Sequence, residues 1–436
     1  MTEQPALRCE VLIVGGGPAG LFLAALLAQH GVDVAVLERR TAPSSDSRAI
    51  GLHPSALHAL GEVGIAQQAA DAGQPIRGGE ARFRGRGLGA LRFARASSDG
   101  FVLALPQSST EALLEARLAA LSPSALRRGW EVTGLQESAH GVVVTARRIA
   151  PRRTGDERTR STDDDGVRNT SENAPSDSPE PLRAASPGSR SSSLSVQAEL
   201  VVGADGARSG VREMLHLCTR GRHYPDSYLM GDFVDPTAAR QDRDAAVHLE
   251  QEGVVESFPL PSRRRRWVVH TGNSVLRGNS PDELVELVRE RTGNAPDPDT
   301  VSMLSSFTVR RRAADRLVTR RCVLIGDAAH EISPIGGQGM TLAWLDALDL
   351  APLAARIDVV TDARDLRTVS GWLRFERSVQ RRARTAGLIA AANTVLGRPT
   401  SAPLAVLRAT AVRAALHTPL RHLLAWTYSM AWTRRH

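Results

Sequence analysis

The sequence contains no lysine, so all 55 of its basic side chains are arginines. An arginine stays protonated and cannot form a Schiff base or act as an amine nucleophile, so chemistry that depends on a lysine amine is excluded. Cysteine is also scarce: Cys9, Cys218 and Cys322 are the three in the chain. Their spacing fits neither a disulfide framework nor a metal site, and we predict no metal centre.

Long apolar runs are absent as well. No stretch of about 18 or more apolar residues could span a bilayer, and the first residues do not resemble a signal peptide. We therefore expect a protein of the reducing cytoplasm. The 436 residues, 42% of them hydrophobic and 23% charged, are typical of a soluble globular chain of two or three domains.

The net charge of +8 is concentrated near the C-terminus, where residues 397–436 carry six arginines and no acid. Leucine and tryptophan side chains lie among these arginines from Pro403 to His436. A basic, apolar helix of this kind either lies on an anionic membrane surface or packs its apolar side on the enzyme, and the sequence leaves both open. The other basic run, Arg263–Arg266, has no interleaved aromatic residues, which favours an exposed hairpin tip over a nucleic-acid site.

Near the N-terminus, a glycine-rich turn joins a predicted strand to a predicted helix. Cys9–Val14 is an apolar, β-rich run, GGGPAG occupies positions 15–20, and a second strand at Val32–Leu37 ends in Glu38. This is the G-x-G-x-x-G pattern in its strand–helix–strand context, with an acid eighteen residues beyond the last glycine. The context makes the pattern far more specific than the glycines alone.

Each part of this pattern has a physical reason. Gly15 permits the tight turn, Gly17 lets the backbone approach a pyrophosphate, and Gly20 lets the helix pack on the strand. The N-terminus of the helix favours negative charge, and Glu38 can accept hydrogen bonds from an adenosine ribose. The segment therefore predicts a bound dinucleotide.

Two later segments repeat the combination of an acid and glycines after a predicted strand. The first of these segments, GADGARS at 203–209, contains Asp205 and Gly206. The other, GDAAHEISPIGGQGM at 326–340, has Asp327 as its second residue and leads into a predicted helix. An acid placed for sugar hydroxyls and a helix end placed for negative charge favour a nucleotide cofactor. Glycine-rich turns also occur for packing reasons, and the third segment alone leaves that alternative open.

Two other kinds of segment lie between the motifs. Short alternating strands between Tyr228 and Thr271 predict an antiparallel sheet with one buried face. Residues 149–195 consist largely of Ser, Arg, Asp, Pro, Thr and Gly, and such a composition cannot bury enough apolar surface to offset its ordering entropy. We predict that this stretch is a disordered insertion between two strands of one hairpin.

The three motifs in this order resemble those of the class A flavoprotein monooxygenases, the p-hydroxybenzoate hydroxylase-like aromatic hydroxylases. The resemblance extends from Cys9 to about Thr394, apart from the insertion. It implies an α/β fold, with a Rossmann-like FAD-binding domain, an inserted antiparallel-sheet substrate domain and C-terminal helices. The expected divisions are 1–80, 98–215 and 300–396 for the FAD-binding domain, 81–97 and 216–299 for the substrate-binding sheet domain, and 397–436 for a basic helical tail.

The resemblance also implies roles for matched positions. These roles are the pyrophosphate turn, the ribose acid, polar groups flanking FAD, a pair that contacts both FAD and the nicotinamide nucleotide, and a loop facing the pyrimidine side of the isoalloxazine. In chain order, the cofactor-binding positions are Gly15, Gly17, Pro18, Ala19, Gly20, Glu38, Arg39, Arg48, Gln107, Asp205, Gly206, Asp327, Pro334, Gly337, Gln338, Gly339 and Met340. His330 is interpreted as a packing residue. The catalytic base stays unknown, with Tyr228 and His270 as weak candidates.

The resemblance implies an enzyme that uses FAD, NAD(P)H and O₂ to hydroxylate an electron-rich aromatic substrate through a flavin hydroperoxide. A phenol, a phenolic lipid, a polyketide or a quinone precursor would suit. Halogenases of this scaffold use an essential lysine, which the chain lacks. A prenyl-chain reductase and a non-catalytic FAD protein that binds a reactive intermediate remain alternatives. No nucleic-acid partner is expected; membrane contact through the tail would make the protein peripheral and its substrate lipophilic.

The glycine turn yields a first prediction. We expect the purified protein to be yellow with tight, non-covalent FAD, and Gly17→Asp to carry no flavin, because the new carboxylate opposes a pyrophosphate in both shape and charge. Flavin absorbance per protein after gel filtration measures this directly. A colourless wild type that FAD cannot reconstitute would contradict the prediction.

Overall fold

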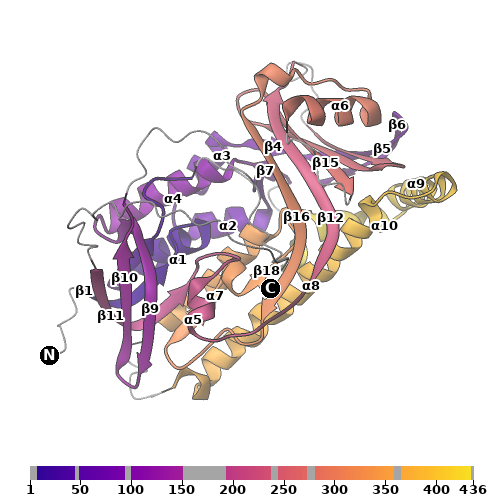
Figure 1. Cartoon of the computed structure of the whole chain (residues 1–436). Coiled ribbons are helices and arrows are strands. Elements are labelled where there is room, and N and C mark those ends of the chain that lie inside the picture. Colours follow the sequence, from indigo (N-terminus) through magenta and orange to yellow (C-terminus); the bar gives the residue numbers. More distant parts are fainter. Residues whose placement is uncertain are drawn as a thin grey trace, which may run out of the picture.

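The computed structural model describes residues 7–44, 49–93, 100–150, 193–236, 244–272, 280–357 and 365–433. The described chain forms two lobes, with helices from the C-terminal part lying along one side of both (Figure 1). Arg48 and most of the predicted insertion lie outside the described residues.

The first lobe is built on a mostly parallel sheet. Its strands follow the order β8 (Leu126–Arg128), β2 (Val34–Glu38), β1 (Leu7–Val14), β11 (Ser193–Gly203), β10 (Gly141–Arg148) and β9 (Trp130–Ser138), with β17 (Cys322–Leu324) paired to β11. The pairs among β8, β2, β1, β11 and β17 are parallel, whereas β9 and β10 extend the sheet as an antiparallel hairpin. Parallel strands place their carboxyl ends at one edge, and all three motifs follow such ends.

Helices pack against this sheet and on one another. They are α1 (Pro18–Gln29), α2 (Pro54–Glu62), α3 (Ala66–Ala72), α4 (Gln107–Leu121), α5 (Gly210–Met214) and α7 (Gly339–Ala354). A small sheet of β3 (Gly51–Leu52), β7 (Val102–Ala104) and β4 (Gln74–Ile76) lies beside them. The central helix α1 is buried along most of its length, as expected of a helix that is apolar on all sides.

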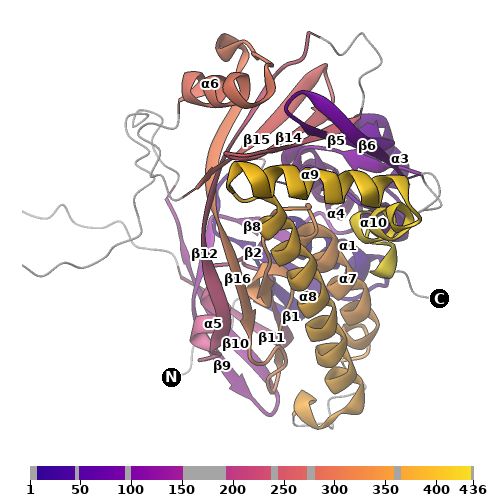
Figure 2. The same ribbon diagram turned by 90° about the vertical axis from the view of Figure 1, so that its right-hand side faces the viewer.

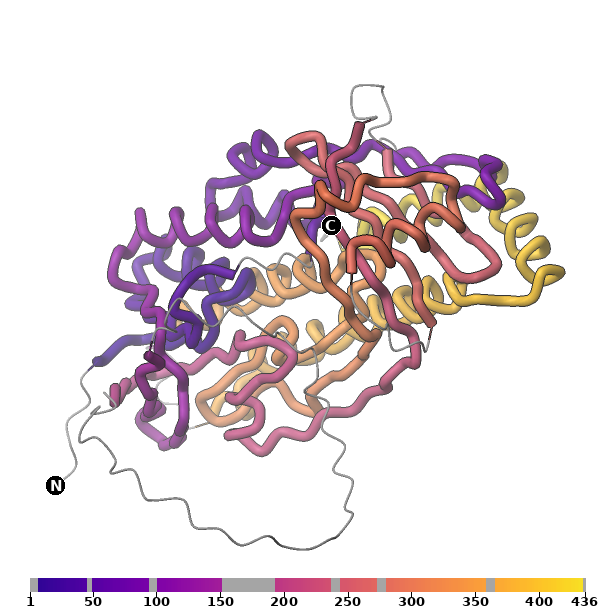
Figure 3. Tube along the Cα trace, turned by 45° about the horizontal axis from the view of Figure 1, so that its top comes forward, coloured from indigo at the N-terminus to yellow at the C-terminus, as the bar shows by residue number. Residues whose placement is uncertain are grey.

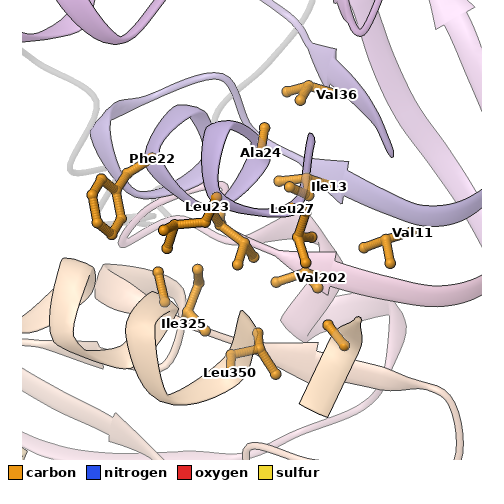
Figure 4. Packing of buried hydrophobic residues seen from close by; sticks show 14 of the residues in the cluster. Val11, Ile13, Phe22, Leu23, Ala24, Leu27, Val36, Val202, Ile325 and Leu350 are labelled. Atoms are coloured by element: carbon orange, nitrogen blue, oxygen red, sulfur yellow. The ribbon is translucent and has the colours of Figure 1, made fainter. Parts of the chain in front are cut away.

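The core of this lobe lies between β1, α1 and α7. Figure 4 shows Ile13, Leu23, Leu27 and Leu350 of these elements, together with Ile325 at the end of β17, pointing toward one another. Phe22 of α1 also stacks on Trp344 of α7, with ring centroids 5.4 Å apart. Because the two helices share this core, their N-termini are held side by side.

The predicted hairpin around the insertion is present, with one correction. β10 and β11 pair antiparallel up to Arg147 and Ser193. β11 therefore begins at Ser193, so residues 193–195 belong to a strand and not to the insertion. Leu194 is buried at 9% exposure, since alternate side chains of the strand point into the core.

The second lobe is a larger sheet. Its order is β18 (His330–Glu331), β16 (Met303–Ala314), β12 (Thr219–Val234), β15 (Arg264–Gly272), β14 (Gly253–Leu260), β13 (Ala245–Glu250), β5 (Gly78–Phe83) and β6 (Arg86–Arg92). The sheet is antiparallel as predicted, except that β5 joins β13 in parallel. Helix α6 (Pro281–Thr292) covers one face, where Leu229, Val255 and Val269 pack on Leu284.

The other face of this sheet is turned toward the first lobe. Side chains alternate along the strands, so Tyr228, Met230, Val254 and Val268 point away from α6. They form a cluster with Ile335, which belongs to the third motif. The third motif therefore lies against the inner face of the second sheet.

The arginine run is not an exposed hairpin tip. Only Arg263 lies in the turn; Arg265 and Arg266 lie in β15 and are buried. Asp232, which faces Arg266 across the β12–β15 pair, binds it at 2.6 and 2.8 Å, and Asp235 binds Arg265 at 2.8 Å. Acids distant in sequence thus neutralise the run within the sheet.

The C-terminal helices are α8 (Ser370–Gly397), α9 (Ala402–His417) and α10 (Leu420–Tyr428). Helix α8 runs along the side of the molecule and leads into α9, which crosses in front of β5 and β6 (Figures 2 and 3). Ala409 and Leu416 of α9 are buried with Leu88 of β6, and Arg408 donates to the carbonyl oxygens of Leu249 and Glu250.

The tail thus packs one side on the enzyme. Its outward side carries the exposed side chains of Leu404, Leu407, Leu423 and Trp426, and contact of this side with lipid stays a prediction. Within the described residues, no helix has the length and apolar content needed to cross a bilayer.

The pairing of β10 with β11 generates a second prediction. Joining residue 151 to residue 192 by a short glycine linker should preserve flavin content and melting temperature, because Arg147 and Ser193 already face each other. A matched deletion through residue 194 removes the buried Leu194 and should lower stability by about 2–5 kcal/mol. Denaturant unfolding measures the stability of both variants. An equal loss of stability in the two would contradict the assignment of residues 193–194 to β11.

Candidate active site

The glycine turn before α1 has room for a ligand on one side only. Gly15 has φ +110°, and a Cβ there would lie 2.4 Å from the carbonyl oxygen of Ala204. A Cβ at Gly20 would lie 1.9 Å from the carbonyl oxygen of Gly15. At Gly17, by contrast, a Cβ would meet no atom within 4 Å. The turn is closed toward the sheet and open at the helix N-terminus, which suits a pyrophosphate.

Glu38 lies beside this turn at the end of β2. Its carboxylate accepts from the backbone N–H of Gly16 at 2.6 Å and pairs with the Arg40 guanidinium at 3.0 Å. Burial acts to raise the pKa of Glu38, but the hydrogen bonds and charge of Arg40 outweigh it and hold the pKa below its usual range. Glu38 is therefore ionised and can accept further hydrogen bonds from ribose hydroxyls.

Arg40 is a residue that sequence reasoning missed. The prediction named Arg39, which is exposed. Arg40 instead bridges Glu38 and Glu111 of α4, and Gln107 donates to Glu111 at 2.9 Å. The sequence shows two arginines, Arg39 and Arg40, after Glu38. Which of the two side chains points toward Glu38 depends on the direction of the backbone, which the sequence does not reveal.

Asp205 and Gly206 follow β11, one strand away from the glycine turn. One carboxylate oxygen of Asp205, Oδ2, accepts from the backbone N–H of Val211 at 3.0 Å. The other, Oδ1, is buried with no hydrogen-bond partner among the described residues. Burial raises the pKa of Asp205, against the hydrogen bonds from Ser209 and Val211. An acceptor left without a partner is a place where a ligand can donate a hydrogen bond.

Asp327 lies where the first and third motifs meet. Gly326 approaches Ala19 so closely that its Cβ would lie 3.4 Å from the Ala19 Cβ, and Trp344 Nε1 donates to the carbonyl oxygen of Pro18 at 3.0 Å. The N-termini of α1 and α7 thus meet on either side of Asp327. The Asp327 side chain is exposed, but the protein atoms packed around it reduce its hydration and raise its pKa to about 6.

The loop from Pro334 to Met340 enters α7 through two residues in the left-handed region, Gly336 at φ +92° and Gly337 at φ +64°. Gln338 is buried, and its Oε1 has no hydrogen-bond partner within the described ranges. The backbone N–H groups at this helix end are placed for a group that carries negative charge.

His53 holds this loop and was not predicted as a site residue. Its Nε2 lies 3.1 Å from the carbonyl oxygen of Gly336. Burial lowers the pKa of His53 to about 4, so the imidazole is neutral and Nε2 donates to that carbonyl. The sequence showed His53 only as the start of a helix, since nothing in it reveals contact with a loop 283 residues away.

His330 has a structural environment, in line with its interpretation as a packing residue. It is buried, and its Nε2 lies 2.6 Å from Asp346 Oδ2, while Arg382 of α8 binds Asp346 Oδ1 at 3.1 Å. Asp346 also accepts from the backbone N–H of Gly326. This buried cluster fixes the turn that carries Asp327.

The two weak candidates for a base differ. His270 Nε2 lies 3.0 Å from Asp226, which Arg398 binds with two hydrogen bonds, and burial lowers the pKa of His270 in spite of Asp226. His270 is thus engaged in a structural ion-pair cluster. Tyr228 is 1% exposed, and its hydroxyl has no partner among the described residues. Burial raises the pKa of Tyr228, which makes it a poor base in this state.

These features fit FAD. The open side of Gly17 suits its pyrophosphate, Glu38 its adenosine ribose, and the unpartnered Asp205 and Gln338 oxygens its polar edges. The sequence model of a family described as "FAD binding domain" matches residues 8–162 and 177–360, well over half of the chain.

The chain belongs to this FAD-binding family. FAD is therefore its cofactor, and the resemblance to the class A flavoprotein monooxygenases is confirmed at the level of family and fold. The individual FAD contacts named above remain predictions of this geometry.

Three similar proteins illustrate the family. The rifampicin monooxygenase of Streptomyces venezuelae is 32% identical over 80% of this chain and 64% of its own. The dialkyldecalin synthase of Streptomyces rugosporus is 30% identical over 83% of this chain and 66% of its own. The solved p-nitrophenol 4-monooxygenase of Pseudomonas putida has the same fold, with a TM-score of 0.78 at 20% identity over 99% and 100% of the two chains. The chain spans about two thirds of the two curated relatives.

The position of Asp327 generates a third prediction. If its carboxylate accepts a hydrogen bond from FAD, then Asp327→Asn should weaken FAD binding by about 1.5–3 kcal/mol at neutral pH. Because the pKa of Asp327 is about 6 and only the ionised form is a charged acceptor, wild-type FAD retention should fall as the pH drops through 6. The Asn variant should lack this fall.

Titration of the apoprotein with FAD at several pH values, followed by flavin fluorescence, measures both effects. Asp282→Asn, an exposed substitution on α6, is the matched control and should behave as the wild type. A pH profile that is the same in Asp327→Asn and wild type would show that this carboxylate does not contact FAD.

Proposed function

We propose that the protein is an FAD-dependent monooxygenase that uses NAD(P)H and O₂ to hydroxylate an electron-rich aromatic substrate. One observation carries the proposal: Ile335, in the loop expected to face the isoalloxazine, packs in one cluster with Tyr228 and Met230 of the second sheet. A substrate on the inner face of that sheet would lie next to the reactive part of FAD. The names of the rifampicin and p-nitrophenol monooxygenases support the same reaction class.

When bound, FAD supplies the redox chemistry, which is to accept a hydride from NAD(P)H and to pass one oxygen atom of O₂ to the substrate. The protein's part is to hold, orient and shield. The N-terminus of α7, entered through Gly337 and Gly339, would stabilise negative charge on the bound flavin. His53 keeps this helix end in position through the carbonyl oxygen of Gly336.

The apolar inner face of the second sheet performs a second task. Met230, Val254, Val268 and Ile335 are all less than 9% exposed, so the cluster excludes water next to the proposed substrate position. An aromatic ring that moves from water to a position against this cluster would gain about 25 cal/mol per Å² of its own apolar area removed from water. The preference for an aromatic and apolar substrate follows from this surface.

The size and lipophilicity of the substrate depend on the outer tail in our proposal. If the exposed leucines and Trp426 of α9 and α10 rest on anionic lipid, the substrate belongs to the phenolic lipids or quinone precursors. If they remain in water, a soluble phenol or polyketide is the better candidate. The named activities of the relatives favour the second class.

A second candidate function follows from the dialkyldecalin synthase, a relative whose name describes no oxygenation. A chain with the same fold could bind FAD and shape a substrate without consuming NAD(P)H. The absence of turnover with reductant, in a protein that still binds FAD, would favour this alternative over hydroxylation.

The fourth prediction tests the proposed function. In air, phenols should accelerate NADPH or NADH consumption by the flavin-loaded protein, and the product should carry one oxygen atom from ¹⁸O₂. A panel of phenols, anilines and fused aromatic polyketides, read by mass spectrometry, covers the class. Reductant consumption without ¹⁸O in any product, or none at all with a fully flavin-loaded protein, would contradict the proposal.

A further inference from the structure

The inner face of the second sheet carries a carboxylate that no part of the site uses. Glu256 lies on β14 between Val254 and Phe258, and all three side chains share one face of the strand. Val254 belongs to the cluster around Tyr228 and Ile335, whereas Phe258 also contacts the cluster around Leu260 and Tyr428. Glu256 thus sits where the second sheet, the third motif and the C-terminal helices meet.

The surroundings of Glu256 are apolar. Its neighbours across the ladder are Val247 of β13 and Val268 of β15. Among the residues that the structure describes, its carboxylate has no hydrogen-bond or ion-pair partner, although it is only half-buried. A carboxylate that is partly open to solvent and has no protein partner can accept a hydrogen bond from a ligand.

The charge of Glu256 acts on two tyrosines, Tyr228 and Tyr428. Tyr228 of β12 is 1% exposed with an unpartnered hydroxyl, and the end of α8 covers it, since a Cβ at Gly397 would lie 3.9 Å from that hydroxyl. The hydroxyl of Tyr428 of α10 donates a hydrogen bond to Asn393 Oδ1 of α8 at 3.5 Å. Burial is the larger cause that raises the pKa of both tyrosines, and the charge of Glu256 raises it further. The pKa of Tyr428 reaches about 12.

The same cluster touches the flavin loop. Asn393, the partner of Tyr428, would lie 3.7 Å from a Cβ at Gly336. Ile335 packs on the Tyr228 side. Tyr228, and Tyr428 through Asn393, therefore border the loop that is expected to face the isoalloxazine. Glu256 lies on the same sheet face as Tyr228, and we call these three residues the Glu256 cluster.

We propose that Glu256 is the catalytic base of this site and that its carboxylate takes the hydroxyl proton of a phenolic substrate. The O–H bond of the phenol breaks, the proton joins a carboxylate oxygen of Glu256, and the electron pair stays on the phenolate oxygen. The phenolate then donates electron density to the ring carbon that receives oxygen. Tyr228, whose hydroxyl has no partner among the described residues, would donate a hydrogen bond to the phenolate oxygen.

The chemistry of Glu256 suits this role. Burial raises its pKa to about 7, so it is poised to accept and release a proton near neutral pH. Asp226 and Arg398, the other charged groups that act on Tyr228, are paired with each other, and neither pairs with Glu256. This inference rests on the proposed function, because it names the class of substrate and the base of the same reaction.

The test measures binding and needs no turnover. The FAD-loaded full chain is titrated by calorimetry with 4-methylphenol and with 4-methylanisole, which has the same ring but no acidic hydroxyl. An ionised Glu256 accepts the phenol's hydrogen bond, so affinity for 4-methylphenol should rise about tenfold from about pH 6 to pH 8, across the pKa of about 7. Affinity for 4-methylanisole should stay level or fall, because it desolvates the carboxylate and donates nothing.

Glu256→Gln should remove both the pH dependence and the preference for the phenol. Glu252→Gln, an exposed substitution in the turn before β14, is the control and should match the wild type. The flavin content of Glu256→Gln shows whether this variant is folded. If the variant does not fold, the comparison of the two ligands on the wild type is sufficient to test the proposal.

A level profile for 4-methylphenol on the wild type, an equal rise for 4-methylanisole, a rise that persists in Glu256→Gln, or no binding of either ligand would each overturn the proposal. Binding with the expected profile in a protein that never consumes NAD(P)H would contradict the monooxygenase and retain the Glu256 site. Phenol-stimulated turnover with a level binding profile would retain the monooxygenase and contradict the role of Glu256. The two proposals can therefore be rejected independently.

Discussion

The structure depends on the meeting of two helix N-termini. Trp344 of α7 donates a hydrogen bond to Pro18 of α1, and a Cβ at Gly326 would lie 3.1 Å from Ala343 of α7 and 3.4 Å from Ala19 of α1. Two positive helix ends point at one place, with Asp327 between them, and this arrangement suits a dinucleotide that carries negative charge at its pyrophosphate and, when reduced, at its flavin. The shared core of α1 and α7 and the buried Asp346 cluster maintain it.

The sequence predicted this half well because its signals are local. Gly15, Gly20 and Gly326 are required by contacts or backbone angles at the turns themselves, and each turn follows a β-rich run that ends at the same sheet edge. The second half depends on contacts across long distances in sequence. Arg266 pairs with Asp232 and His53 contacts Gly336 only because the strands and loops meet in space, and neither pair has a sequence pattern.

Glu256 shows the same limit in the candidate site. In the sequence it is one polar residue in an alternating strand, which normally indicates the solvent face. In the structure, the inner face of the sheet is covered by the third motif and by the ends of α8 and α10, so the same alternation places Glu256 on that covered face, next to Val247 and Val268. The C-terminal helices, whose packing the sequence left open, thereby complete the proposed substrate site.

The most direct test of this account is a crystal structure of the flavin-reconstituted protein. We expect density for the pyrophosphate at the open side of Gly17, the adenosine ribose at Glu38, and the pyrimidine edge of the isoalloxazine at the backbone of Gly337–Met340, with its reactive side toward Glu256. Density for the isoalloxazine away from the α7 N-terminus, or turned from the inner face of the second sheet, would contradict the account.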